Sequence, residues 1–283
     1  MEHDVGVGDW VPPVKFNNGM EHPHNFTVPD AVVSTALMHY AVTLLAGIAK
    51  VTGRADEYVE LKNTAAEIKK AFLDKWRSGC GRLAPESQSA YAYAVFCGLF
   101  PENERQAAAD RLAELFAANG CKHTTGNIGT KYLLEVLSRY GYTELVWKLV
   151  ASKDYPGWGY MVENGATTLW ERWEKLEGNG MNSHNHPMLG APCCWLFRYI
   201  AGIKIEDGCI GADKVELSPV FVKELDHASA VYDSRSGKYS VHWYRNNGKV
   251  IFDFEIPAGC TANVRMPDGS MKEFAGGSYS LGF

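Results

Sequence analysis

The chain has 283 residues, of which 46% are hydrophobic and 22% are charged, and its formal net charge at pH 7 is −5. This balance is typical of a folded globular protein and excludes a disordered chain. Lysine and arginine are scattered without a basic run, so the sequence offers no surface for the phosphates of a nucleic acid. The length allows one large domain or two ordinary ones.

The amino-terminal residues and the cysteines bear on the cellular compartment. Residues 1–5 (MEHDV) lack the basic stretch and the apolar stretch of a secretory signal. The longest apolar stretch, residues 41–49, is shorter than a bilayer span and indicates part of a packed helix. Seven cysteines at irregular spacing form no CxxC pair, which favours free thiols in a reducing compartment. We therefore expect a cytoplasmic protein with no membrane partner.

Apolar residues recur at helical spacing through most of the chain. They predict helices over residues 30–52, 56–76, 87–99, 104–118, 127–139, 143–151 and 187–200. Residues 155–160 (YPGWGY) contain helix breakers and predict a loop that presents aromatic rings. Alternating short and long connections fit an α/α-hairpin array or an α/α toroid, although a bundle or a solenoid has the same periodicity.

The pattern changes after about residue 202. Short alternating runs predict strands over residues 214–217, 228–232, 239–244, 250–256, 261–266 and 278–281. Turn sequences such as NNG at 246–248 and PDG at 267–269 separate them. This predicts a small all-β sandwich domain. We place the domains at residues 1–205, which are helical, and 206–283, which form the sandwich.

The densest group of candidate catalytic residues lies between residues 155 and 186. Glu171 stands between Trp170 and Trp173, whose rings would partly desolvate its carboxylate and raise its basicity, as a general base requires. An ordinary ion pair with Arg172 is the alternative. Glu174 competes with Glu171, since on a helix it would lie on nearly the same face.

The histidines do not predict a metal site. His22 with His24 and His184 with His186 form HxH pairs, but neither pair has a carboxylate or a third histidine at ligand spacing. The sequence has no GxSxG motif, no phosphate-binding glycine-rich loop and no dinucleotide fingerprint. We expect no metal and no cofactor. His186, in a turn before a helix, fits a residue that binds a sugar hydroxyl or orients the base.

Two segments resemble the signatures of the bacterial α-L-rhamnosidases, glycoside hydrolase family 78. They are residues 165–173 (GATTLWERW) and 180–186 (GMNSHNH). Weaker matches occur in the family's order at residues 8–10 (GDW), 125–130 (TGNIGT), 156–161 (PGWGYM) and 200–203 (IAGI). The ordered set covers essentially the whole chain.

The resemblance implies a mainly α fold, a partial (α/α)6 toroid of the six-hairpin glycosidase type, followed by a small C-terminal all-β sandwich. It also implies hydrolysis of terminal α-L-rhamnose from glycosides with inversion. Glu171 would be the general base. The residues expected to line the rhamnose pocket are Asp9, Trp10, Trp158, Trp170 and His186.

The sequence departs from the family at one point. The general acid of the family lies in a motif of the type DxxRDExxWxGD, upstream of the GDW element, and this chain contains no such motif. The resemblance therefore implies a chain that begins part-way round the toroid, with seven predicted helices where a closed toroid needs twelve. Besides rhamnose-containing glycosides, we expect as partner the missing N-terminal half of the enzyme or a second copy in a homodimer. A non-catalytic sugar-binding or structural remnant, and a different toroidal glycosidase, are the alternatives.

Overall fold

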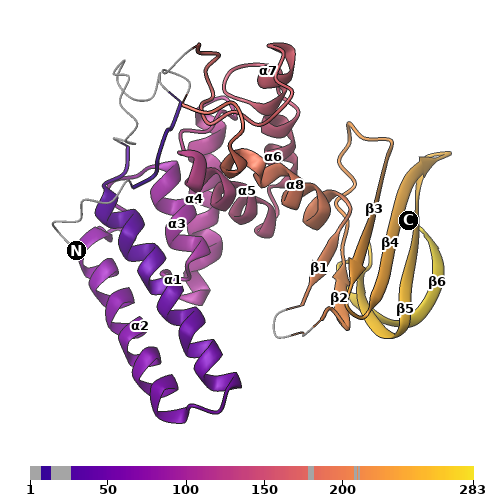
Figure 1. The fold of residues 1–283 in the computed structure, drawn as a ribbon, viewed down its shortest axis with the longest axis horizontal. Helices are drawn as coiled ribbons and strands as arrows, with labels where there is room; N and C mark the ends of the chain where they lie inside the picture. The colour runs from indigo at the N-terminus through magenta and orange to yellow at the C-terminus, as the bar shows by residue number, and fades with distance from the viewer. Residues whose placement is uncertain (1–7, 14–26, 178–181, 207–208, 210) are drawn as a thin grey trace. The chain divides into compact units, whose positions relative to one another are not determined.

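The computed structural model describes residues 8–13, 27–177, 182–206, 209 and 211–283. The chain divides into two compact units, Met1–Ala191 and Pro192–Phe283 (Figure 1). The second unit begins before the predicted boundary at residues 205/206, because the turn that precedes the sheet is bonded to it. The Trp243 Nε1 atom donates a hydrogen bond to the Ile200 carbonyl at 2.8 Å.

The first unit is helical. Its helices are α1 (Asp30–Val51), α2 (Ala55–Trp76), α3 (Gln88–Phe96), α4 (Arg105–Ala118), α5 (Asn127–Arg139), α6 (Thr143–Val150) and α7 (Trp158–Glu163). The six helices predicted between residues 30 and 151 are present, each within three residues of its predicted limits. The loop predicted over residues 155–160 is wrong in its second half, because Gly157 is the N-cap of α7 and the breakers precede the helix.

The segment from Pro187 to Ile200 was predicted as one helix and is built from three pieces. A 3₁₀ turn (Pro187–Gly190) leads into α8 (Ala191–Trp195), and a π-helical turn (Leu196–Ile200) follows. Proline at the first position of the 3₁₀ turn suits a helix start, where its missing N–H has no acceptor to lose.

Helix α3 is the centre of the helical unit and contacts α1, α4 and α5. All residues from Gln88 to Val95 are buried. Its sequence, QSAYAYAVF, has small or aromatic side chains on every side, which is typical of a helix surrounded by others. Ser87 caps it, since its hydroxyl accepts a hydrogen bond from the Ala90 N–H at 3.2 Å.

Helices α1 and α2 form an antiparallel hairpin (Figure 1). An 18-residue window of α1 has a mean hydropathy of 1.7, yet only 28% of that window is buried. By length and composition α1 could cross a membrane, but core helices of soluble proteins and signal sequences meet the same criteria. Its large exposed side chains are Met38, Leu44, Leu45, Ile48 and Val51. A contiguous apolar face of this kind marks a contact surface.

The second unit contains a sheet (Figure 1). Its strands are β1 (Ile203–Ile205), β2 (Lys214–Leu217), β3 (His227–Ser234), β4 (Gly237–Asn246), β5 (Lys249–Arg265) and β6 (Met271–Gly282). They form one six-stranded sheet in the order β1-β2-β5-β4-β3, with β6 also paired to β5. All pairs are antiparallel except β2 with β5. We predicted a sandwich, whereas the described strands form one connected sheet. Two strands expected at residues 250–256 and 261–266 are one long strand, β5.

Strand β5 changes partners along its length, pairing first with β4 and then with β2, while β6 follows both halves. A register shift between Ile256 and Thr261 marks the change. Gly237 lies against the bend with a φ of +125°, and a Cβ there would come within 2.6 Å of Pro257. Inward-facing Tyr239, Trp243 and Phe252 are fully buried, so one face of this part of the sheet is core and the other is exposed.

Candidate active site

The two signature segments lie side by side in the helical unit. The Glu171 N–H donates to the Ser183 carbonyl, and the His186 N–H donates to the Leu169 carbonyl, both at 2.9 Å. The Thr168 hydroxyl also donates to the carbonyl of a residue in the second segment. These backbone bonds bring Glu171 and His186, both half-buried, onto one short ladder.

The two candidate carboxylates differ in their surroundings. Glu171 accepts one long hydrogen bond, 3.4 Å from the Asn182 side-chain amide to Oε1. Among the described residues, Glu171 has no ion pair with Arg172. Glu174 accepts a hydrogen bond from the Tyr155 hydroxyl, which ties it to the loop before α7. The Glu171 carboxylate is therefore the less constrained of the two.

A buried aromatic cluster supports this segment. Trp173 is fully buried and meets Trp158 edge to face, with ring centroids 5.0 Å apart and planes at 81°. The Trp158 ring N–H donates to the Leu189 carbonyl at 2.8 Å. Trp158 and Trp170 are only 8% and 4% exposed. Both were predicted to line the sugar pocket, and the structure gives each little free surface.

Asp9 was also predicted as a sugar ligand and is fully buried. The Ser89 hydroxyl and the Gly126 N–H donate to its Oδ2, and the Tyr93 hydroxyl and the Gly129 N–H donate to its Oδ1. Burial and the Asp9 carboxylate raise the pKa of Tyr93 well above its ordinary value, so that hydroxyl stays protonated and donates. Asp9 thus joins α3 to the N-terminus of α5, where a helix favours a negative charge.

Trp10 follows on the same segment and is half-buried. Its carbonyl accepts a hydrogen bond from the Asn127 N–H at 2.8 Å. Gly126 has to be glycine here, since a Cβ would come within 2.4 Å of backbone atoms of Asp9 and Trp10. The GDW and TGNIGT motifs, far apart in sequence, are therefore one structural unit.

His123 was missed by the sequence analysis and connects this unit to the tryptophans. Its ring lies 4.4 Å from that of Trp173, and its Nδ1 is 3.2 Å from both oxygens of Thr125. Complete burial lowers the pKa of His123 to about 3, so the ring is neutral. A single histidine fifty positions from its ring partner gives no sequence signal.

Of the two HxH pairs considered as metal ligands, the structure describes only His184 and His186. His22 and His24 lie outside the described residues. His184 is exposed, and His186 has a buried Nδ1 without a hydrogen-bond partner in the described part of the chain. Among the residues that can be placed, no group of three or more histidines, cysteines or carboxylates could hold a metal ion.

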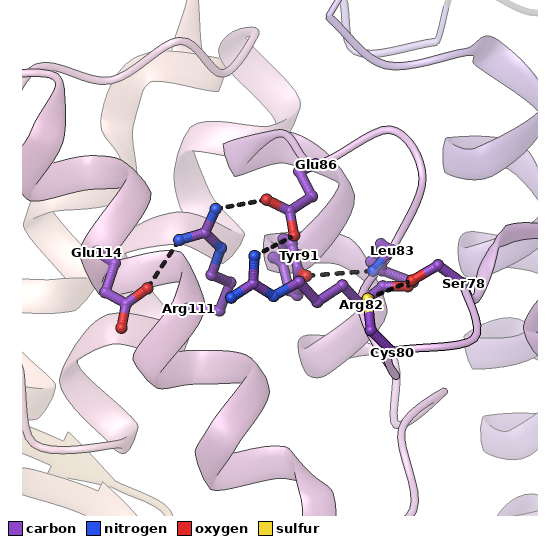
Figure 2. Close-up of polar contacts among 8 residues, drawn as sticks. All are labelled: Ser78, Cys80, Arg82, Leu83, Glu86, Tyr91, Arg111 and Glu114. Carbon is purple, nitrogen blue, oxygen red and sulfur yellow. Dashed lines mark hydrogen bonds and ion pairs between the residues drawn. The ribbon is translucent and has the colours of Figure 1, made fainter.

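A hollow of about 470 Å³ lies elsewhere in the helical unit and contains none of the predicted site residues. Figure 2 shows the polar contacts at its edge. Arg111 pairs with Glu86 and Glu114, so its charge is neutralised. The sulfur of Cys80, which lines the hollow, is 3.0 Å from the Ser78 hydroxyl, and this hydrogen bond lowers the pKa of the exposed thiol. The contacts stabilise the loop after α2.

Both parts of the chain match domains of a known protein family. Residues 1–200 match the bacterial alpha-L-rhamnosidase 6 hairpin glycosidase domain, and residues 210–279 match the bacterial alpha-L-rhamnosidase C-terminal domain. The chain belongs to the bacterial α-L-rhamnosidases of glycoside hydrolase family 78. The predicted resemblance to this family is confirmed, and so is a helical domain followed by a β domain.

Individual α-L-rhamnosidases are also similar to this chain in sequence and in structure. The α-L-rhamnosidase of Streptomyces avermitilis is 33% identical over 269 residues, which are 93% of this chain and 25% of that protein. One from Alteromonas sp. is 30% identical over 92% of this chain and 29% of its own. The α-L-rhamnosidase structure from Aspergillus terreus has a TM-score of 0.89 at 26% identity, covering 98% of this chain and 33% of its own.

The S. avermitilis enzyme has also been solved in complex with L-rhamnose, with a TM-score of 0.86 and 29% identity. The match covers 98% of this chain and 28% of that structure. This chain therefore spans about a quarter to a third of the length of these relatives.

Proposed function

We propose that this chain carries the general base of an inverting α-L-rhamnosidase, and that Glu171 is that base. The observation that carries the proposal is the backbone ladder between the two signature segments, which holds the half-buried Glu171 beside His186. The Tyr155 hydroxyl bonds Oε1 of Glu174, and Oε2 of Glu174 is buried, which supports Glu171 over its neighbour because a base needs an oxygen that water can reach.

In this mechanism the Glu171 carboxylate takes a proton from a water molecule as the water oxygen attacks the anomeric carbon of rhamnose. The glycosidic oxygen leaves with a proton from a second carboxyl group, placed roughly 6.5–9.5 Å from the first to leave room for the water. His186 and Trp10, both half-buried, contact the sugar. The buried Trp158 and Trp170 hold the segments that carry the base, and Asp9 joins α3 to α5.

This sequence lacks the family's acid motif, which would carry the second carboxyl group. We propose that the N-terminal half of a rhamnosidase supplies it and packs on the exposed face of α1. Leu44 and Leu45 on this face are each 50% exposed, and Val51 is 83% exposed. Burying such side chains contributes roughly 1.5–3 kcal/mol each. A homodimer that covers the same face is the rival arrangement.

The test is hydrolysis of p-nitrophenyl α-L-rhamnoside by the chain alone and mixed with the preceding part of the S. avermitilis relative. We expect activity in the mixture, with Glu171→Gln lowering kcat by about 10²–10⁴-fold. Glu174→Gln is the matched control, because its amide oxygen still accepts from Tyr155, and it should keep most of the rate. Proton NMR of the first sugar released should show the inverted anomer.

Three results would count against the proposal. Loss of rate in Glu174→Gln, with Glu171→Gln unaffected, would make Glu174 the base. Release of rhamnose with retention would exclude this mechanism. Rhamnose binding without hydrolysis in either sample would favour a non-catalytic sugar-binding remnant. Light scattering distinguishes the two proposed partners. If the chain forms a homodimer, its average mass rises with its own concentration, without the N-terminal half.

A further inference from the structure

The exposed face of the sheet carries two rows of side chains in register. Across β3, β4, β5 and β6, strand pairing aligns Val231, Ser240, Glu255 and Ser278 in one row, and Ser229, His242, Asp253 and Ser280 in the next. Val241 and Phe254, which lie between the two rows, are buried in the core. Because side chains alternate along a strand, both rows lie on the same, outer face.

These two rows line an open hollow with a volume of about 740 Å³. Neighbouring strands are about 4.8 Å apart, so three spacings give a width of roughly 14 Å. The hollow lies entirely on the second unit. It has room for a short oligosaccharide laid across the strands.

The lining has the chemistry of a carbohydrate site. Asp253 and Glu255 supply carboxylates, which accept hydrogen bonds from sugar hydroxyls, and four serine hydroxyls both donate and accept. The Ser280 hydroxyl donates to Asp253 Oδ1 at 2.6 Å and so orients that carboxylate. The His242 ring is stacked on Tyr244, with centroids 5.0 Å apart and planes at 26°. The exposed His242 ring lines the hollow, where it can pack against the apolar C–H face of a pyranose.

Charge narrows the class of ligand. None of the residues that line the hollow is lysine or arginine. Nucleic acids, phosphates and acidic polysaccharides need such cations, so they do not fit here. Among the described residues no cluster suited to a metal ion occurs. A basic peptide would be attracted by the two carboxylates, but it would leave the hydroxyls and the stacked rings without a role.

We propose that this outer sheet face binds a neutral glycan chain, at a site separate from Glu171. The site would hold the glycan part of a substrate near the enzyme while terminal sugars are removed. The binding itself does not depend on turnover, so it can be tested in the Glu171→Gln variant, where the ligand is not consumed. Failure of catalysis and failure of this site are then distinguishable.

The experiment is an NMR titration of ¹⁵N-labelled Glu171→Gln protein with cellohexaose, xylohexaose and, separately, tetralysine at millimolar concentration. We expect at least one hexasaccharide to shift the amide resonances of the two rows, with an affinity that added salt leaves unchanged. His242→Ala and Asp253→Asn should each weaken this binding about tenfold, a loss of about 1.4 kcal/mol in binding free energy. Circular dichroism checks that both variants fold.

Lys238→Ala is the matched control, because Lys238 lies on the same face of β4 but does not line the hollow. It should bind the hexasaccharide as the parent does. The proposal is wrong if neither hexasaccharide shifts the rows, or if Lys238→Ala weakens binding as much as His242→Ala. Salt-sensitive binding of tetralysine without glycan binding would assign the face to a basic peptide instead, since exposed charge pairs are screened by salt.

Discussion

Replacing Asp9 distinguishes a structural residue from a sugar ligand. In Asp9→Ala the Gly126 and Gly129 N–H groups lose their acceptor inside the protein, and neither can turn to another. The Ser89 and Tyr93 hydroxyls can rotate and lose less. A buried donor without a partner costs about 1–3 kcal/mol, so two backbone groups together predict a loss of about 4 kcal/mol.

The assay is urea unfolding followed by tryptophan fluorescence and by circular dichroism, with the variant compared to the parent chain. Since domains of this kind are stabilised by roughly 5–15 kcal/mol, Asp9→Ala should unfold at a much lower urea concentration. Asp9→Asn, which keeps one acceptor, should lose about half as much. Ser89→Ala, which removes one rotatable donor, should lose only about 1 kcal/mol.

One result would refute this reasoning. If Asp9→Ala unfolds at the same urea concentration as the parent and only weakens rhamnoside binding, its carboxylate serves the sugar and not the fold. The role implied by the family resemblance would then hold, and the four hydrogen bonds to Asp9 would be of little consequence for stability.

Two further predictions concern a histidine and a thiol. Burial lowers the pKa of His123 from 6.5 to about 3, so between these pH values the unfolded chain binds a proton that the folded chain does not bind. The free energy of unfolding is therefore at its full value above about pH 6.5 and falls as the pH drops toward 3. Between pH 7 and pH 5 the loss is about 2 kcal/mol, and urea midpoints should show a steeper decline for the parent than for His123→Asn; parallel declines would contradict it. Cys80, with its thiol pKa lowered by Ser78, should react with iodoacetamide faster than the exposed Cys193 and Cys194, as read by peptide mass spectrometry. Ser78→Ala should remove this advantage, and equal labelling of the three cysteines in the parent would speak against it.

The helices between residues 30 and 151 could be predicted because each has a regular apolar pattern and a residue that ends it, such as Gly53 or Gly141. Strand β5 could not be predicted as one strand, because Pro257 and Gly259 have the residue types of a turn. In the structure they lie at a bulge, where a missing N–H and an irregular backbone are tolerated.

The candidate site also contains residues that the sequence could predict and residues that it could not. Glu171 and His186 could be selected from local motifs, since each stands in a run of unusual residues. The partners of Asp9 could not, because Ser89 and Tyr93 lie 80 and 84 positions further along the chain. Periodicity reports which side of an element is apolar, but it carries no information on which distant elements meet.

The Asp9 bonds have a consequence for how the helical unit folds. Gly126 and Gly129 follow Asp9 by 117 and 120 positions, so this contact closes one of the longest loops in the unit. Closing such a loop costs chain entropy before the contact forms and contributes stabilising energy, and this slows folding. During synthesis the GDW segment has to wait until α5 has left the ribosome. Residues 8–10 are then among the last parts of the helical unit to pack.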